Sequence, residues 1–495
     1  MKKAWNKADA TLDAAKVPSP EERLAGNWGY LLDLELGIPS RDFREYMCDC
    51  ILSAIRFYTK AMKDASDWKK TVTIYQGYSF YFYRSSNPLQ FQSGFDIFRK
   101  VLELDTIDHI GTPISYENRE IGNIGPNNNP FNGSAALHGK MMWQENDLRT
   151  HLRPMPEYGS STTAEETREL LRRGFGMSLT TGTGFWYFPG YQWHDNMTLD
   201  TIAELKQLGD GALKADRRSA AEIALIFDEA SMQYSSGALR SNFIDDHCWF
   251  LYNKMFLTGA PFDCFLASDL AHPKMKDYKL YIMMNSFFAD QKMRETIAAK
   301  VRRNNAVVLW NYAPGIFSEN GRDEKNMLDL TGIKLKFENR RVTESISITD
   351  KAHPITKNAS KQRAYPVQPL VWADDPQVQV LGKVAGRPAL VVKESGNWTS
   401  IFTLMPFTQE MLNGLCDFAG VHRYLKSGDV LTANHGFVAL HTVTQGDKSI
   451  VLPGKYDVKE LYSGKIIGNG ISAFTEAQLP RGVSRLYKIT PSNQR

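Results

Sequence analysis

The chain has 495 residues, of which 42% are hydrophobic and 23% charged, an ordinary composition for a globular protein of about two to four domains. A net charge of only +4, without a basic stripe interleaved with aromatic residues, argues against nucleic acid as a partner. No apolar run approaches the length of a membrane span, and polar residues follow Met1-Lys2-Lys3, so neither a membrane partner nor a signal peptide is indicated; the compartment, cytoplasmic or periplasmic, stays undetermined.

The first part of the chain alternates between helix-like and strand-like segments. A long helical stretch lies near Tyr46 to Lys63, and residues 69–78 have the composition of a strand that runs into an aromatic loop. Residues 93–102 have helical spacing, and residues 107–113 have the length and the breaker residues of a short buried strand. Strand, helix and strand in this order predict a parallel βαβ unit.

Residues 139–151 form the most informative stretch of the chain. They place Glu145 at the end of a short apolar run, close to Trp143, and Asp147, Arg149 and His151 follow at two-residue spacing. A strand that ends at Glu145 would bring this carboxylate to the mouth of a (β/α)8 barrel, where such folds assemble their chemistry. Arg149 can orient a neighbouring carboxylate, and the indole of Trp143 can stack on a sugar ring. The alternative is that Glu145 and Arg149 are an i, i+4 pair on a solvated helix.

A second aromatic cluster follows this stretch. Thr162-Thr163-Ala164-Glu165-Glu166 is a capping box for a helix through Arg173, and residues 182–194 form a loop rich in glycine and aromatic residues. The loop is typical of a sugar pocket. Its alternative role is a hydrophobic plug, which suits Phe185 and Phe188 better than Trp186, because the Trp186 indole N–H needs a partner.

Several of these segments together resemble the second half of a clan A glycoside hydrolase barrel, most like the family 42 β-galactosidases and their trimeric β-mannosidase-like relatives. They are Tyr75-Gln76-Gly77-Tyr78, Ser93-Gly94, Pro113-Ile114-Ser115-Tyr116 with Arg119, His138-Gly139-Lys140, Glu145 to His151 and Gly182 to Trp186. The resemblance implies that Glu145 is the catalytic nucleophile. It also implies substrate-binding roles for Trp143, Asp147, Arg149, Tyr75, Tyr78, Tyr116, Arg119 and Trp186.

One half of the expected active site has no counterpart in the sequence. Retaining enzymes of this clan use a second carboxylic acid, usually after an Asn at the end of the fourth barrel strand. No Asn-Glu pair on a plausible strand precedes Tyr75, and Glu22, Glu35 and Glu45 lie in loop-like or helical surroundings. We therefore expect the chain to start in mid-barrel, without roughly the first four strands, which puts its activity in question and leaves strand edges and apolar faces uncovered.

The second predicted domain is a doubly wound α/β sheet. Residues 221–228, 278–284 and 306–310 are strand-like, and residues 243–257 and 290–303 are helical. This pattern resembles the class I glutamine amidotransferase-like fold that serves for trimerisation in the family, and it implies a homotrimer.

The amidotransferase nucleophile itself is missing. It would be a cysteine in the turn after a central strand, but that turn is Asn311-Tyr312-Ala313-Pro314-Gly315, and Cys248, inside a predicted helix, cannot replace it. The paired acids Asp228-Glu229 and Asp245-Asp246 are expected to be solvated helix caps or sheet-end residues, in preference to a catalytic role. We therefore predict an assembly scaffold.

From about Ser427 the pattern changes to short alternating runs at residues 436–441, 448–452, 458–462 and 483–489, which predict a small β-sandwich that serves as a packing module. The expected domains are a partial TIM barrel (1–212), an α/β trimerisation domain (213–426) and a C-terminal β-sandwich (427–495).

Cysteine and histidine do not indicate a metal site. The five cysteines have no ligand spacing and are Cys48, Cys50, Cys248, Cys264 and Cys416, and the ten histidines form no cluster. We predict no disulfide framework, no catalytic metal and no cofactor.

The expected function is hydrolysis of terminal β-glycosides, of the β-galactosidase type, by double displacement with retention. The alternatives are a β-mannosidase or another β-glycosidase of the same clan, or a carbohydrate-binding or assembly protein that lacks catalysis. The expected partners are a β-glycoside substrate and further copies of this chain.

Overall fold

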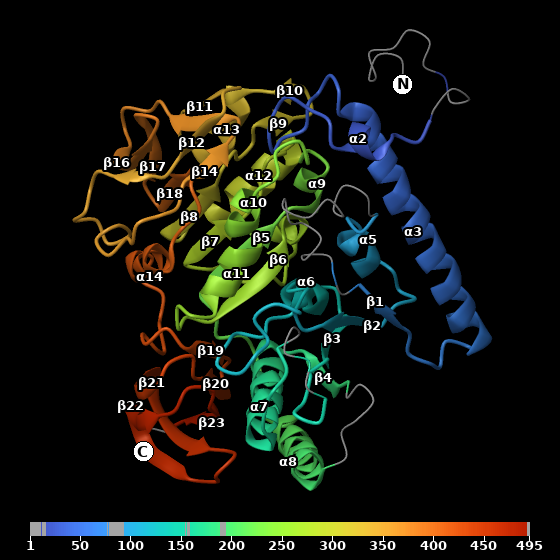
Figure 1. The fold of residues 1–495 in the computed structure, drawn as a ribbon, viewed down its shortest axis with the longest axis vertical. Coiled ribbons are helices and arrows are strands. Elements are labelled where there is room, and N and C mark those ends of the chain that lie inside the picture. Colours follow the sequence, from blue (N-terminus) through green and yellow to red (C-terminus); the bar gives the residue numbers. More distant parts are fainter. Residues whose placement is uncertain are drawn as a thin grey trace.

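The computed structural model describes residues 11, 16–76, 78, 94–153, 155, 159–188 and 195–492, and their strands form three main sheets (Figure 1). Parts of the predicted motifs lie outside the described residues, namely Met1-Lys2-Lys3, Gly77, Ser93 and residues 189–194 of the aromatic loop.

The first sheet has four parallel strands that pair in chain order, which confirms the predicted βαβ arrangement. This part of the chain contains α2 (Pro20–Arg23), α3 (Ile38–Ala65), β1 (Thr73–Tyr75), α5 (Phe98–Leu102), β2 (His109–Pro113), α6 (Asn132–Leu137), β3 (Met141–Asn146), α7 (Ala164–Thr181), β4 (Gly184–Tyr187) and α8 (Asn196–Ala212). The predicted long helix is α3, with 28 residues. The predicted capping residues start α7, where the Thr163 hydroxyl accepts a hydrogen bond from the Glu166 amide.

Strand β3 has two different faces. Gln144 and Asn146 are buried against α7: the Ser178 hydroxyl bonds the Gln144 side chain, and Gly174 lets the helix approach so closely that a Cβ there would lie 2.3 Å from Asn146 Oδ1. Met141, Trp143 and Glu145 point to the opposite face and are partly accessible. Tyr75 of β1 is 55% exposed and Met141 38% exposed, so this face is partly accessible in the described part of the chain.

The second sheet has eight strands in the order β13-β16-β17-β18-β8-β7-β5-β6. Its parallel strands are β5 (Ile223–Phe227), β6 (Phe262–Leu266), β7 (Leu280–Met283), β8 (Ala306–Asn311) and β18 (Trp398–Thr403), and β13 (Ser347–Ile348), β16 (Gln379–Val384) and β17 (Arg387–Glu394) continue it antiparallel. The parallel order β6-β5-β7-β8-β18 is the flavodoxin-like order of a doubly wound sheet, so the predicted α/β architecture is confirmed.

Helices and small strands complete this part. They are α9 (Glu229–Met232), α10 (Phe243–His247), α11 (Trp249–Met255), the 3-10 helix η3 (Ala267–Ala271), α12 (Gln291–Val301), α13 (Glu324–Thr331) and α14 (Gln409–Phe418), with β9 (Phe317–Ser318), β10 (Gly321–Arg322), β11 (Leu335–Glu338), β12 (Val342–Glu344), β14 (Tyr365–Val367) and β15 (Leu370–Ala373).

The structure corrects two predictions in this region. The helix expected over residues 243–257 is two helices, and Cys248 lies in the break between them, with its thiol 3.6 Å from the Met284 carbonyl. Asp245 and Asp246 are buried, not solvated, because Arg363 and Tyr365 from a distant segment bond the Asp246 carboxylate.

Two further positions named in the sequence analysis, Asp228 and Tyr312, are buried in the structure. Asp228 is a cap, as expected, but a buried one, and it accepts hydrogen bonds from the amides of Ala230 and Ser231. In the turn after β8, Tyr312 adopts φ 60° and donates its buried hydroxyl to the Pro369 carbonyl, 3.3 Å away. The chain therefore turns sharply after β8, with a tyrosine where an amidotransferase would need its cysteine.

The third sheet corrects the predicted β-sandwich. Its strands, β19 (Val430–Ala433), β20 (Phe437–His441), β21 (Gly446–Glu460), β22 (Ile466–Leu479) and β23 (Ser484–Pro491), form one antiparallel sheet in the order β19-β20-β23-β21-β22. The two runs expected at 448–452 and 458–462 are a single strand, β21. Its pairing shifts register between Val451 and Tyr456, so Pro453-Gly454 is accommodated as an irregularity and does not end the strand.

Helix α7 joins the first and third sheets (Figure 1). One side contacts β3, and the other side packs against the third sheet, where a Cβ at Gly176 would lie 3.0 Å from the Ala439 side chain and the hydroxyls of Thr180 and Thr432 are 2.6 Å apart. The Tyr462 hydroxyl also bonds the Arg172 carbonyl at 3.0 Å. The third sheet therefore packs, through α7, against the first sheet, which carries Glu145.

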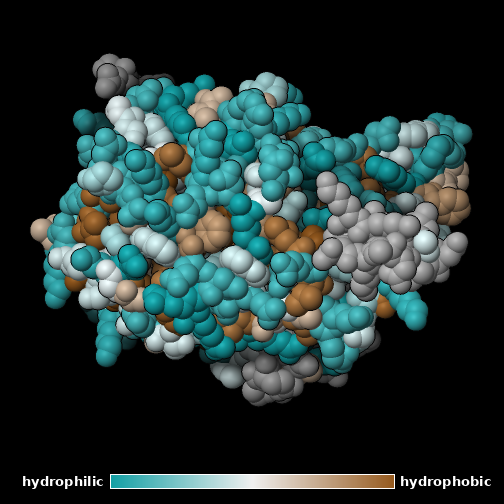
Figure 2. All heavy atoms as spheres, turned by 90° about the horizontal axis from the view of Figure 1, so that it is seen from above, coloured by the Kyte–Doolittle hydropathy of each residue, from teal (hydrophilic) through white to brown (hydrophobic). Residues whose placement is uncertain are grey.

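The surface is mostly hydrophilic on the face seen from above, with apolar side chains in scattered patches (Figure 2). Among the described helices, none combines the length and the apolar character that crossing a bilayer requires.

Candidate active site

Glu145 lies at the C-terminal end of β3, between Pro113 of β2 and Trp186 of β4 in the sheet register. Glu145 lies in a strand and residues 147–153 form no helix, so the alternative of a solvated helix that pairs Glu145 with Arg149 is wrong. Because parallel strands bring their carboxyl ends to one edge, Tyr75 of β1 and Trp186 of β4 meet Glu145 there.

Tyr75 and Trp186 form a short hydrogen-bonded series with Glu145. The Tyr75 hydroxyl bonds the Glu145 carboxylate, and the Trp186 indole N–H bonds the Tyr75 oxygen. Trp186 thereby has the partner that its N–H requires. Burial raises the pKa of the Glu145 carboxyl above its ordinary value, while the Tyr75 bond lowers it, and the charges of Asp147 and Arg149 act in opposite directions.

Asp147 is the centre of a second group. Its carboxylate pairs with Arg149, and Arg119 donates to its main-chain carbonyl and has Nη1 3.9 Å from its Oδ2. Arg149 donates a hydrogen bond to Asp147, and its charge lowers the pKa of Glu145, in the direction expected of a residue that keeps this carboxylate ionised.

Arg119 is fully buried, and its guanidinium lies 4.3 Å from the ring centroid of Tyr116. Burial lowers the pKa of this guanidinium, and its Nε and Nη2 have no hydrogen-bond partner among the described residues. Tyr116 stacks on Tyr78 at 6.4 Å, and their hydroxyls are 3.3 Å apart. The group thus offers buried donors and aromatic faces, as sugar hydroxyls and ring C–H groups require.

The remaining predicted residue is Trp143, which lies on the same face of β3 as Glu145, two residues before it. Its ring centroid is 5.5 Å from that of His109. His151, which continues the two-residue spacing, bonds Thr167 and lies 2.7 Å from the Asp195 carboxylate, so it fastens the loop after β3 to the start of α8.

Gly111 is a site residue that the sequence reasoning missed. The Tyr75 ring lies over it, and a Cβ at this position would be 3.1 to 3.3 Å from three ring carbons. An isolated glycine inside a strand signals close approach of another group, so the signal was present in residues 107–113.

Replacing Gly111 with Ala is therefore expected to displace the Tyr75 ring and to weaken its bond to Glu145. A displacement of this kind lowers catalytic efficiency by up to about a hundredfold. The measurement is kcat/KM on an aryl β-glycoside together with a crystal structure of the variant. Gly211→Ala in α8, where a Cβ meets nothing within 4 Å, is the matched control and should leave both unchanged. An unmoved Tyr75 ring in Gly111→Ala would contradict the explanation.

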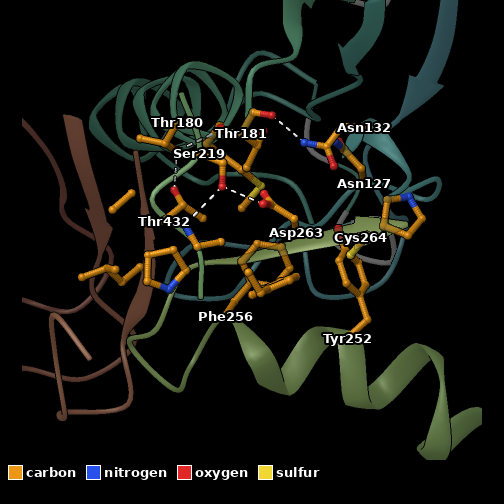
Figure 3. Close-up of a pocket in the computed structure, with 17 residues that line it drawn as sticks. Asn127, Asn132, Thr180, Thr181, Ser219, Tyr252, Phe256, Asp263, Cys264 and Thr432 are labelled. Carbon is orange, nitrogen blue, oxygen red and sulfur yellow. Dashed lines mark hydrogen bonds between the residues drawn. The ribbon is translucent and has the colours of Figure 1, made fainter. Parts of the chain in front are cut away.

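A small cavity of about 40 Å³ lies where α6, α7, β6 and β19 meet (Figure 3). Its polar side chains bond one another across the junction: Ser219 donates to Asp263 at 2.6 Å, and the hydroxyls of Thr180 and Thr432 are 2.6 Å apart. The cavity has room for a few water molecules, and none of the predicted site residues lines it.

This arrangement, a four-stranded parallel sheet with Glu145 at a strand end followed by a flavodoxin-like sheet and an antiparallel sheet, is similar in fold to β-galactosidases, so the predicted resemblance is confirmed for the fold. Solved structures that resemble the chain are the β-galactosidases of Bacillus circulans sp. alkalophilus (15% identity, TM-score 0.60), Rahnella sp. R3 (15%, 0.64) and Halorubrum lacusprofundi (13%, 0.59).

These matches cover 99%, 99% and 98% of this chain, and 74%, 73% and 73% of the respective β-galactosidases. No protein-family model matches the sequence, and no curated protein does. At this level of identity the likeness shows the fold.

Proposed function

We propose that the chain carries the nucleophile of a retaining β-glycosidase of the β-galactosidase type. The observation that carries this proposal is the placement of Glu145, a half-buried carboxylate at a parallel strand end that is held by Tyr75 and flanked by aromatic and guanidinium groups. The described residues include no group of metal-binding side chains, and the proposed reaction needs none.

In the proposed first step, a Glu145 oxygen attacks the anomeric carbon, the glycosidic C–O bond breaks, and a carboxylic acid protonates the departing oxygen. In the second step, water attacks the same carbon while that carboxylate takes its proton, and Glu145 is released. The sugar hydroxyls would be bound by Arg119, Arg149 and Asp147. Tyr78 and Tyr116 would lie beside these three residues. The sugar ring would be faced by Trp143 and Trp186.

The proton donor has no assigned residue in the described part of the chain. Asp147 is the carboxylate whose charge acts on Glu145, but Arg149 and Arg119 engage it. This observation favours the second candidate, a protein that binds carbohydrate without hydrolysing it. A panel of aryl β-galactoside, β-mannoside and β-glucoside substrates tests the proposal: turnover of one substrate supports it and names the sugar. Binding of the sugars without turnover of any of them would support the second candidate.

We also propose the domain boundaries 1–212, 213–426 and 427–495 and a homotrimer assembled through the middle domain. The boundaries fall in the connections between α8 and β5 and between α14 and β19. Light scattering of the purified protein gives the number of copies.

Tyr75→Phe is expected to move the acid limb of the pH profile upward. The lost hydrogen bond lowers the pKa of Glu145 in the native protein, so its removal raises that pKa further. Glu145 must be ionised to attack, and activity is lost as the pH falls through its pKa, so the loss begins at higher pH in the variant. The measurement is kcat/KM against pH. Tyr58→Phe, at an exposed position of α3, is the control, and an unshifted limb in Tyr75→Phe would remove Tyr75 from this role.

A further inference from the structure

The loop between β2 and α6, residues 114–131, delivers Tyr116 and Arg119 to the candidate site and contains no helix or strand. A loop of this length needs anchors if it is to hold a buried guanidinium in place. One anchor comes from the second sheet's helices, where the Trp249 indole N–H donates to Glu117 at 3.3 Å.

The second anchor is Arg173 of α7. Its fully buried guanidinium donates to three main-chain carbonyls of the loop, those of Arg119 (2.7 Å), Glu120 (2.9 Å) and Asn123 (2.8 Å). Burial lowers the pKa of Arg173 to about 9. Because all three acceptors are main-chain carbonyls, Arg173 fixes the backbone conformation of the loop, and these bonds do not depend on the loop's side chains.

The third anchor comes from the C-terminal sheet. The Gly122 amide donates to His441 Nε2 at 3.0 Å, and Arg481 donates to the Gly122 carbonyl at 3.3 Å. Since an amide can only donate, Nε2 accepts, and the imidazole is neutral with its proton on Nδ1. That proton bonds the Ser484 hydroxyl at 2.9 Å, and Ser484 donates to the Glu169 carbonyl at 2.7 Å. The loop, the third sheet and α7 are thus joined by one continuous series of hydrogen bonds.

We propose that His441 and Arg173 are positioning residues for sugar binding, and that the C-terminal sheet, expected to be a packing module, serves to hold Arg119 and Tyr116 against Asp147. This inference rests on the proposed function for its kinetic consequences. Its structural part, the anchoring of the loop by the third sheet, is independent of any activity. The residues that His441 and Arg173 hold contact the Asp147 group and not Glu145, so their effect falls on binding.

The test compares His441→Leu, which removes the acceptor, with His441→Gln, whose amide oxygen can accept the Gly122 N–H. Hydrogen–deuterium exchange of residues 115–125 should rise at least about tenfold in His441→Leu and return toward the wild-type rate in His441→Gln. With an aryl β-glycoside as substrate, KM should rise about tenfold in His441→Leu while kcat stays within about twofold. Arg481→Ala, at an exposed position, should raise the exchange of the same residues without threatening the fold.

Val438→Ala is the matched control, because Val438 lies on the same strand as His441, is buried in the other cluster of the sheet and does not touch the loop. It should destabilise the sheet and leave loop exchange unchanged. Wild-type loop exchange in both His441→Leu and Arg481→Ala, or an equal rise in Val438→Ala, would overturn the inference. If no variant and no wild-type protein hydrolyses the substrate, the proposed function fails, and the exchange data still decide the anchoring.

Discussion

Replacing Glu145 with Gln is expected to reduce β-glycoside hydrolysis by roughly 10⁴-fold or more, because the amide cannot form the covalent intermediate. The replacement keeps the shape of the side chain and an oxygen that accepts the Tyr75 hydrogen bond. Sugar binding should therefore persist. The measurement is kcat on an activated aryl β-galactoside, with binding of the free sugar followed by tryptophan fluorescence.

The same variant should not lose stability. The pKa of Glu145 is raised in the folded chain, so its contribution to stability is present at low pH and is lost as the pH rises through that pKa; at neutral pH the ionised side chain is a net cost. Gln removes this cost, and the thermal midpoint should stay or rise. Glu165→Gln, at an exposed position in the first turn of α7, is the control for activity. Full activity in Glu145→Gln would place the nucleophile elsewhere.

Lys448→Met is expected to destabilise the protein by about 3 to 5 kcal/mol, because it leaves a buried carboxylate without its counter-charge. Lys448 and Asp429 have side chains 2% and 0% exposed, and Nζ lies 2.7 Å from Oδ2. The amides of Val443 and Thr444 also donate to Asp429, so the carboxylate cannot turn toward water without losing these two backbone hydrogen bonds. The measurement is the free energy of unfolding from denaturant titration.

Lys455→Met is the matched control, since Lys455 lies on the same strand, β21, and is exposed. It should change the free energy of unfolding by no more than about 0.5 kcal/mol. Adding Asp429→Asn to Lys448→Met should recover part of the loss, because no unpaired charge then remains buried. Equal stability of Lys448→Met and Lys455→Met would show that the pair contributes nothing.

The parts of the fold that the sequence predicts are those with strong local patterns. Residues 223–227, 280–283 and 306–310 are continuous apolar runs because these strands are buried on both faces, and a parallel sheet is the structure that buries both. Glu145 could be placed at a strand end because an apolar run stops there.

The sequence could not predict features that depend on distant partners. Asp246 is buried because Arg363 and Tyr365, more than a hundred residues later, bond it, and the role of His441 depends on the amide of Gly122, 319 residues earlier. Likewise, Pro453-Gly454 signals a turn locally, and only pairing with β22 keeps it within a strand. Gly111 is intermediate, because its signal is local but its meaning requires knowing that Tyr75 lies above it.

The position of α7 between two sheets has a consequence for cooperativity. The Gly176 side of the helix packs against Ala439 of the third sheet and the Thr180 hydroxyl bonds Thr432, while the opposite side supports the strand that ends at Glu145. Unfolding of the C-terminal sheet would expose this side of α7 to solvent. A destabilised α7 would in turn provide less packing for β3. We therefore expect the third sheet and the strand that carries Glu145 to unfold together, so a substitution that unfolds the last strands would also remove intact sites, although it lies far from Glu145 in the sequence.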